Sequence, residues 1–159
     1  MKSGYNFESH SAQQTEQFGT AIAKALQPGQ VIALHGDLGS GKTALTRAIC
    51  SALGIDSDVV NSPTFVLMQL YQSSNFQVAH FDTYRLADAD EFLAVGGEDY
   101  LLSNEYICLV EWAERIEELL PRDRIDIFIT QTAETSRAFS VKAVGEQSTL
   151  VLKQLRQPQ

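Results

Sequence analysis

The stretch "QVIALHGDLGSGKTALTRAICSALG", residues 30–54, decides the fold. An apolar run, "VIAL", leads into the glycine-rich loop "GDLGSGKT" at residues 36–43. After the loop, Leu45, Ile49 and Leu53 recur at the spacing of one helix face, and a glycine directly after Leu53 is suited to end that helix. The stretch therefore predicts a strand, a glycine-rich loop and a helix, in that order.

The loop matches the pattern G-x-x-x-x-G-K-[ST] through Gly36, Gly41, Lys42 and Thr43. Glycines at these positions and at Gly39 allow positive φ values, which turn successive N–H groups inward. A helix that begins near Lys42 directs the positive end of its dipole at a bound anion. Lys42 is placed to reach the β- and γ-phosphates, and the Thr43 hydroxyl to bind Mg²⁺. The loop predicts a site for a nucleoside triphosphate with magnesium.

Two acids follow apolar runs elsewhere in the chain, Asp82 in "VAHFDTYR" and Glu111 in "ICLVEW". Each is therefore expected at the carboxyl edge of a sheet beside the loop. Such a site needs at least one acid, to hold the metal or to orient the nucleophile. The residues alone do not assign these two roles, and either acid also fits an ordinary solvated position at the end of a strand.

The remaining segments alternate between strand and helix patterns, which predicts an α/β fold. We expect one P-loop NTPase-like domain over residues 1–159, with three layers and a mixed, mainly parallel central sheet that has antiparallel edge strands. The expected strands are 5–9, 65–71 and 76–84 (a hairpin), 105–112, 124–132 and 137–143; the expected helices are 11–27 with Ser11 as N-cap, two short ones in 86–102 broken at Gly96 and Gly97, and 113–120; residues 148–155 fit either.

Composition narrows the function classes. The chain has 159 residues, of which 44% are hydrophobic and 20% charged, enough apolar material for one ordinary core. No apolar run approaches the ~20 residues that span a bilayer, and no apolar block follows Lys2, so we expect no membrane contact, no secretory signal and a cytoplasmic location. The net charge of −8 disfavours binding of nucleic acid by this chain alone.

The cysteines and histidines do not suggest a transition-metal site. Cys50 and Cys108 are far apart, each within an apolar stretch, so both are expected to be buried, reduced thiols. His10, His35 and His80 are scattered, and the chain has no C-x-x-C or H-x-x-x-H pairing.

Four motifs together, "GDLGSGKT", "NSPTF", "HFDTYR" and "LVEW", closely resemble the TsaE (YjeE) family. Members are the small P-loop ATPases of bacterial tRNA threonylcarbamoyladenosine synthesis. The resemblance runs from about Ser9 to Arg137, and the combination of motifs in this order makes it specific, since a P-loop alone occurs in many families.

The resemblance implies ATP and Mg²⁺ as cofactors and assigns roles to residues. Thr43 and Glu111 would hold the metal, and Asp82 would act with Lys42 in catalysis. "NSPTF" and the segment around Asp82 correspond to switch-like loops, and the adenine pocket draws on the region from Ser11 to Thr15 and on the late strand near Arg137. Trp112 also fits a core position, and Arg137 an ordinary surface position. The implied nucleotide contacts are Ser11, Asp37, Leu38, Gly39, Ser40, Gly41, Lys42, Thr43, Trp112 and Arg137.

The resemblance also implies partners. TsaD would transfer the threonylcarbamoyl group from its adenylate onto adenosine of tRNA, and the present chain would supply ATP hydrolysis that drives or resets the TsaB–TsaD complex. The chain would meet tRNA only indirectly through that complex, and its activity would be low alone and higher with its partners.

Two other functions remain open on the sequence. A small-molecule kinase would need an acceptor pocket and usually an arginine-rich lid, whereas residues 86–104 are acidic and carry no arginine cluster. A nucleotide-dependent binding module would act through ATP occupancy and not through turnover. The two differ from the ATPase in whether a metabolite is phosphorylated and whether hydrolysis is needed.

Overall fold

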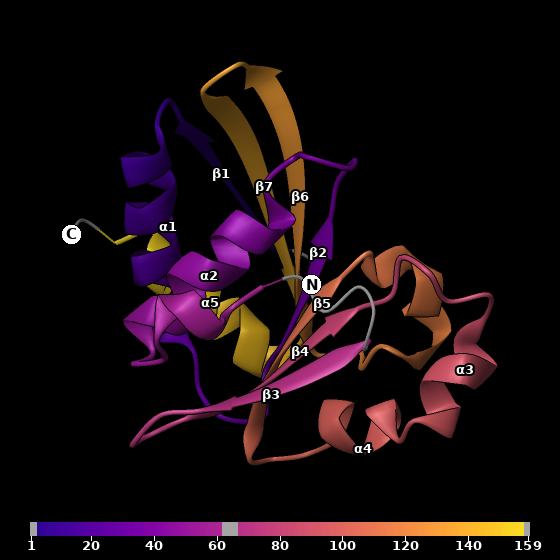
Figure 1. The fold of residues 1–159 in the computed structure, drawn as a ribbon. Helices are drawn as coiled ribbons and strands as arrows, with labels where there is room; N and C mark the ends of the chain where they lie inside the picture. The colour runs from indigo at the N-terminus through magenta and orange to yellow at the C-terminus, as the bar shows by residue number, and fades with distance from the viewer. Residues whose placement is uncertain (1–2, 62–66, 158–159) are drawn as a thin grey trace.

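A seven-stranded sheet forms the middle of the computed structural model, which describes residues 3–61 and 67–157 (Figure 1). The strand order is β1-β7-β6-β2-β5-β4-β3. The four central strands β6, β2, β5 and β4 are parallel, and the pairs β1–β7, β7–β6 and β3–β4 are antiparallel. This confirms a mixed sheet with a parallel centre and antiparallel edges. The strands are β1 (Ser3–Ser9), β2 (Val31–His35), β3 (Met68–Gln72), β4 (Gln77–Asp82), β5 (Tyr106–Glu111), β6 (Arg124–Ala133) and β7 (Ser136–Val144).

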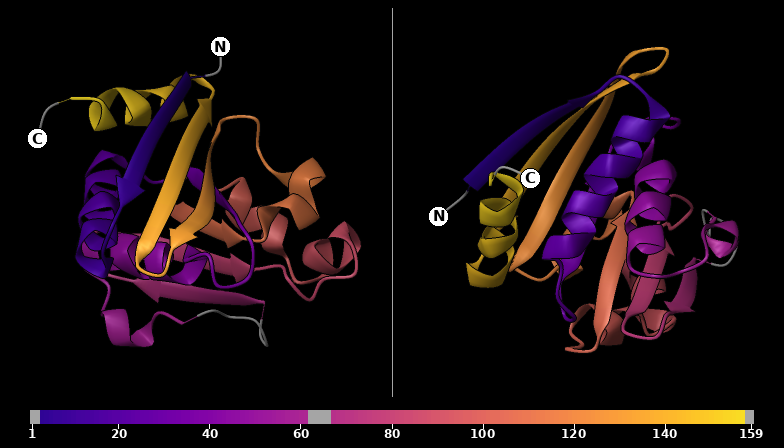
Figure 2. Two further views of the ribbon diagram at one scale, coloured as in Figure 1. Left: turned by 90° about the horizontal axis from the view of Figure 1, so that it is seen from above. Right: turned by 90° about the vertical axis from the view of Figure 1, so that its left-hand side faces the viewer.

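Helices cover both faces of the sheet, so the fold has the three layers expected (Figures 1 and 2). One face carries α1, α2 and α5, and the other carries α3, α4 and the 3-10 segment η2. Parallel strands buried on both faces read as continuous apolar runs, as "VIAL" of β2 and "ICLV" of β5 do. The helical elements are α1 (Ala12–Ala25), α2 (Lys42–Ala52), η1 (Ser57–Val59), α3 (Ala89–Ala94), α4 (Gly97–Leu101), η2 (Ala113–Leu119) and α5 (Glu146–Leu155).

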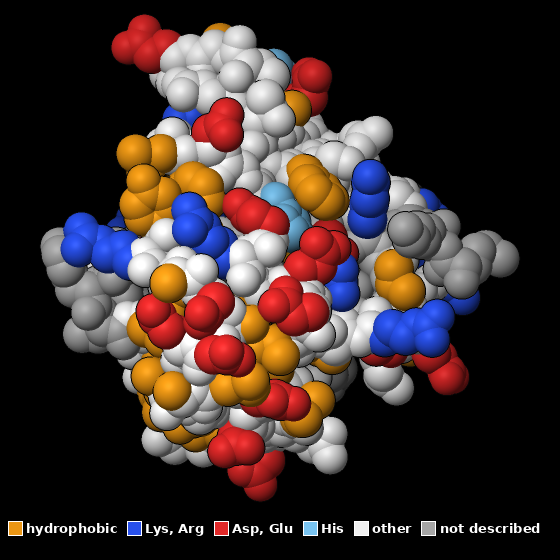
Figure 3. All heavy atoms as spheres, turned by 90° about the vertical axis from the view of Figure 1, so that its right-hand side faces the viewer, with side chains coloured by type: hydrophobic (Ala, Val, Ile, Leu, Met, Phe, Trp, Pro, Cys, Tyr) orange, Lys and Arg blue, Asp and Glu red, His pale blue; other side chains and the backbone are white. Residues whose placement is uncertain are grey.

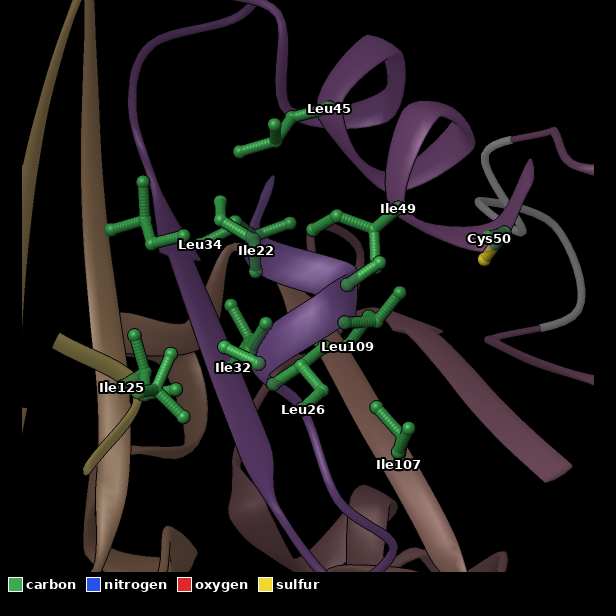
Figure 4. Packing of buried hydrophobic residues seen from close by; sticks show 14 of the residues in the cluster. Ile22, Leu26, Ile32, Leu34, Leu45, Ile49, Cys50, Ile107, Leu109 and Ile125 are labelled. Carbon is green, nitrogen blue, oxygen red and sulfur yellow. The ribbon is translucent and has the colours of Figure 1, made fainter. Parts of the chain in front are cut away.

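The larger core lies between the sheet and α1, α2 and α5. Figure 4 shows Leu45 of α2 directed toward Leu34 of β2, and Ile49 of α2 directed toward Leu109 of β5. All four side chains are fully buried. Apolar burial of this kind contributes about 25 cal/mol per Å² removed from water, and it fixes α2 against the two strands whose ends form the site described below.

The first helix begins as the sequence predicts. Ser11 is the N-cap of α1, and its side chain accepts a hydrogen bond from the Gln14 backbone N–H at 3.1 Å. Further along, Gly19 lets α1 approach α2 closely, because a Cβ there would lie 2.5 Å from the Ala48 Cβ. The capped end of α1 is thereby held beside the start of α2.

Three segments refine the expectation or settle an open one. Residues 113–119 are helical as expected, in the form of the 3-10 segment η2 with a kink at Ile116, whose φ and ψ of −127° and 29° are non-helical. Residues 146–155 are a helix, which settles the ambiguous C-terminal segment. Strand β3 is Met68–Gln72, Leu67 before it has a left-handed φ of 67°, and residues 65–66 of the expected strand lie outside the described residues. The two short helices α3 and α4 break at Gly96 as predicted.

Two expectations about the whole chain can be compared with these elements. Within residues 3–61 and 67–157, no helix combines the length and the apolar character that crossing a bilayer would need. Cys50 and Cys108 are both buried and unpaired with each other, as the sequence predicts.

Candidate functional site

The glycine-rich loop connects β2 to α2 at the carboxyl edge of the parallel strands. Gly39 and Gly41 have φ values of 80° and 115°, which only glycine adopts without strain. Gly36 is needed for close approach, because a Cβ there would lie 2.5 Å from Ser40 Oγ and 2.7 Å from the Ile129 carbonyl oxygen. The loop delivers the chain into α2 at Lys42, so the first N–H groups of that helix, which have no intrahelical acceptor, border the loop.

Lys42 is almost completely buried, with 5% of its surface exposed. Its Nζ donates hydrogen bonds to the carbonyl oxygens of Gly36 at 2.5 Å and Asp37 at 3.0 Å. Burial lowers the pKa of this ammonium below its ordinary value, and the nearby carboxylates of Glu111, Glu114, Asp82 and Asp37, in that order of strength, oppose the shift. The charge is therefore held inside the loop with carbonyl oxygens as its direct partners.

Thr43 and Glu111 meet across the site. The Thr43 hydroxyl donates a hydrogen bond to Glu111 Oε1 at 2.7 Å, although 68 residues separate them. Hydroxyl and carboxylate oxygens are the donor atoms that Mg²⁺ prefers, so this pair fits a magnesium ion. No group of three or more His, Cys, Asp and Glu side chains suited to a metal occurs among the described residues. A magnesium ion here would therefore take its remaining ligands from phosphate oxygens and water.

Asp82 stands beside Glu111 at the same edge of the sheet. The two residues are direct partners in the register of β4 and β5, and each ends its strand. Asp82 is 4% exposed, and its Oδ1 accepts the Tyr84 backbone N–H at 2.9 Å. The fold thus brings both acids to the carboxyl edge, as the sequence predicts.

Trp112 lies over Lys42, directly after Glu111. The Lys42 Nζ is 4.0 Å from the centre of the indole ring. Trp112 has a left-handed backbone, with φ of 58°, and the Thr83 hydroxyl donates to its carbonyl oxygen at 2.5 Å. Its side chain is half-buried, so Trp112 borders the glycine-rich loop and does not belong to the hydrophobic core.

A cavity of about 730 Å³ opens beside Gly41 and runs between α1 and α2 along most of their length. Ser11, Thr15 and Arg137 all line it, so the residues predicted for adenine come together. Arg137 also contacts the loop, because its Nε donates to the Ser40 carbonyl oxygen at 2.8 Å. The cavity is large enough for a nucleoside and is continuous with the residues that begin α2.

Of the predicted nucleotide set, Ser11, Gly41 and Arg137 line that cavity, whereas Asp37, Leu38 and Ser40 line a separate one. Asp37 and Leu38 form the tip of the loop, and Leu38 is 78% exposed. The separate cavity has a volume of about 420 Å³ and is also lined by His35 and Phe128. Asp37 takes part in the site through its carbonyl oxygen, which accepts from Lys42. In "NSPTF", only Asn61 is described, and residues 62–65 lie outside the described residues.

Sequence reasoning missed His80. It is fully buried in β4, and its Nε2 lies 2.5 Å from Glu111 Oε2. The available signal was a histidine within the apolar run "VAHF", two positions before Asp82 and therefore on the same face of the strand. A polar ring in that position requires a buried partner, which the sequence does not identify.

The acidic charge gathers on the side of the molecule that carries α3 and α4. Figure 3 shows many Asp and Glu side chains over this side. Residues 86–114 contain neither lysine nor arginine. The segment therefore has none of the cations that a kinase lid places over phosphates.

A family model described as "Threonylcarbamoyl adenosine biosynthesis protein TsaE" matches residues 9–139. The chain belongs to the TsaE family. The match agrees with the extent of the resemblance expected from the four motifs. TsaE membership places this chain in tRNA threonylcarbamoyladenosine biosynthesis.

Individual TsaE proteins are similar in sequence to this chain over most of its length. It is 36% identical over 143 residues to the tRNA threonylcarbamoyladenosine biosynthesis protein TsaE of Bacillus subtilis, covering 90% of this chain and 88% of that protein. It is 33% identical to the protein of the same name from Treponema pallidum, covering 84% and 96%. A crystal structure of Bacillus subtilis YdiB superposes with a TM-score of 0.78 at 29% identity, covering 98% of this chain and 95% of that one.

Proposed function

We propose that this TsaE-family chain binds Mg·ATP at the loop of residues 36–43 and hydrolyses it to drive or reset a complex of TsaB and TsaD. Contact with tRNA would be made through that complex. One observation carries the proposal: the Thr43 hydroxyl and the Glu111 carboxylate are 2.7 Å apart, next to the buried ammonium of Lys42. This supplies metal ligands and phosphate-binding charge at one point.

The chain's own groups divide the work. The loop amides and the N-terminus of α2 bind phosphate oxygens. Lys42 exchanges the carbonyl oxygens of Gly36 and Asp37 for phosphate oxygens. Thr43 and Glu111 would hold a magnesium ion, which would supply positive charge beside the phosphates.

Asp82 is the residue proposed to orient or deprotonate the attacking water. Its carboxylate stands in register with Glu111, so it faces the same edge of the sheet without being the residue bonded to Thr43. General-base positioning of this kind typically contributes about 10²- to 10⁴-fold in rate. We propose a low rate for the chain alone, which rises when TsaB and TsaD order the site.

The deciding experiment is reconstitution with purified TsaB, TsaD and substrate tRNA. Phosphate release and threonylcarbamoyladenosine formation are measured together, with and without the present chain. We expect ATP consumption to depend on the partners and multiple rounds of modification to depend on this chain. Modification that continues through many turnovers without it would refute the proposal.

Two controls separate the other functions. Asp82→Ala should bind ATP but not hydrolyse it; if this variant still supports multiple turnovers, ATP occupancy is enough and the chain is a binding module. Incubation of the chain alone with ATP and a metabolite panel tests for a kinase, which would yield a phosphorylated metabolite.

A further inference from the structure

His80 occupies a buried position directly behind Glu111. It lies in the centre of β4, paired with Leu109 of β5, and none of its surface is exposed. Nε2 is 2.5 Å from Glu111 Oε2, and Nδ1 is 3.0 Å from the Tyr71 hydroxyl. Both ring nitrogens therefore have a partner, one on β5 and one on the neighbouring strand β3.

The chemistry of the hydrogen-bond partners determines which ring nitrogen of His80 is a donor. An ionised carboxylate only accepts hydrogen bonds, so His80 Nε2 is the donor toward Glu111. The other carboxylate oxygen, Oε1, accepts from the Thr43 hydroxyl. One donor on each oxygen fixes the rotation and tilt of the carboxylate before any ligand arrives. Ordering a flexible glutamate side chain costs rotamer freedom, so a carboxylate that is already ordered binds a cation more tightly.

Tyr71 holds His80 in turn. Its hydroxyl donates a hydrogen bond to Gln69 Oε1 at 2.8 Å. The chain of contacts thus runs from Gln69 through Tyr71 and His80 to Glu111. These residues come from β3, β4 and β5, so the sheet register sets the distances between them.

Packing alone does not require a histidine here. Val78, two residues earlier on the same face of β4, is fully buried against the apolar core. An apolar side chain at position 80 would fill the same layer without the cost of removing an imidazole from water. What an apolar side chain would lack is a hydrogen-bond donor for Glu111.

We propose that His80 is a positioning residue that orients the Glu111 carboxylate for magnesium, with Tyr71 orienting His80. This rests on the proposed function, because it needs Glu111 to be a metal ligand. Hydrogen-bonding partners behind a metal ligand typically change metal affinity or activity by about 10- to 100-fold when they are removed. The role concerns metal affinity and leaves nucleotide binding without metal unaffected.

Calorimetry with the full-length chain and a non-hydrolysable ATP analogue tests this at a series of Mg²⁺ concentrations and in EDTA. We expect His80→Leu to raise the Mg²⁺ concentration for half-maximal enhancement of binding by about 10- to 100-fold, with affinity in EDTA unchanged. His80→Gln keeps an N–H donor on its side-chain amide and should recover most of the loss. Tyr71→Phe should show a smaller shift in the same direction.

Val78→Ala is the matched control, because it removes packing from the same face of β4 without touching Glu111. It should lower the melting temperature and leave the Mg²⁺ dependence of binding unchanged. If His80→Leu does not fold, His80→Gln and Tyr71→Phe decide the question. The proposed donor would be contradicted if Tyr71→Phe had the Mg²⁺ dependence of the wild type and His80→Gln lost the enhancement of binding by Mg²⁺ completely.

The outcomes separate the positioning role from the proposed function. If the wild-type chain binds the analogue equally with Mg²⁺ and with EDTA, Glu111 holds no metal and both proposals fail. If the wild type depends on Mg²⁺ and His80→Leu has the same dependence, only the positioning role is overturned. Equal losses with Mg²⁺ and in EDTA would mean that His80 supports the loop as a whole, which also overturns it.

Discussion

The Lys42 ammonium lies 4.0 Å from the centre of the Trp112 ring, inside a loop whose carbonyl oxygens are its direct partners. A phosphate anion would compete for this ammonium and draw it away from the ring. Trp112 is the single tryptophan of the chain, so its fluorescence reports this contact without background. We predict that Mg·ATP or Mg·ADP changes the intensity or wavelength of the emission in a saturable way.

Lys42→Met tests the source of that signal. The variant keeps a long side chain beside the indole but has no charge to bind phosphate, so affinity should fall at least tenfold and the emission change should disappear. Circular dichroism serves as the check that the fold persists. An unchanged nucleotide titration in this variant would mean that Lys42 does not bind phosphate.

Substitutions of Asp82 and Glu111 should have different effects, although the two residues are neighbours in the sheet. Asp82→Asn is expected to lower the partner-stimulated hydrolysis rate by about 10²- to 10⁴-fold while Mg·ATP affinity stays near that of the wild type. Glu111→Gln should lose the Mg²⁺ dependence of binding, because Glu111 and not Asp82 is bonded to Thr43. Binding by calorimetry and phosphate release together measure both effects. The reverse pattern would exchange the two assigned roles.

Arg137 is expected to contribute to nucleotide affinity through the loop. Its Nε donates to the Ser40 carbonyl oxygen at 2.8 Å, and its side chain lines the cavity beside Gly41. A hydrogen bond to a charged group contributes about 1.5–3 kcal/mol, so Arg137→Ala should weaken ATP binding by about tenfold or more. Arg122→Ala, which removes an exposed arginine outside the cavity, is the control and should bind normally.

Much of the fold follows from local sequence pattern. Residues 30–54 predict the β2–loop–α2 unit, and the apolar runs before Asp82 and Glu111 predict strands that end at one edge. Periodicity does not distinguish α from 3-10 geometry, so the sequence predicts a helix at η2 without its type, and the short pattern of α5 fits a strand equally well.

The sequence predicts those parts of the candidate site that lie within one motif. It does not predict the parts that strand pairing brings together from distant positions. Gly36, Lys42 and Thr43 stand in a single loop, and their arrangement follows from their spacing. The contact of His80 with Glu111 joins residues 31 positions apart through the register of β4 and β5. A single sequence does not give that register, so neither this contact nor the choice between Asp82 and Glu111 as the partner of Thr43 could be derived.

The close approach of α1 to α2 should be sensitive to one methyl group. A Cβ at Gly19 would lie 2.5 Å from the Ala48 Cβ and 3.1 Å from the Ala48 carbonyl carbon, so the helices would have to separate. We expect Gly19→Ala to reduce the free energy of unfolding by about 1–3 kcal/mol, despite the higher helix propensity of alanine.

Urea unfolding followed by circular dichroism measures this change. Gln17→Ala, on the exposed side of the same helix, should stay within about 0.5 kcal/mol of the wild type. A Gly19→Ala variant as stable as the wild type would show that α1 can shift away from α2 without cost.

The two thiols should be unreactive toward thiol reagents in the folded chain. They should also lower the free energy of unfolding at alkaline pH. Burial raises the pKa of both Cys50 and Cys108 to about 12, from an ordinary value of 9.0. At pH 8 neither forms a thiolate in the folded state, so Ellman's reagent should label them only after denaturation.

The sign of the alkaline effect follows from the same raised pKa values. The folded state favours the neutral thiol, so its stabilising contribution is complete below the unfolded pKa of about 9 and is lost as pH rises toward 12. The free energy of unfolding should therefore fall more steeply above pH 9 in the wild type than in a Cys50→Ala, Cys108→Ala double variant. Urea titrations at a series of pH values measure the difference. Equal slopes in the two proteins, or rapid labelling of either thiol at pH 8 without denaturant, would show that these cysteines are accessible in the folded state.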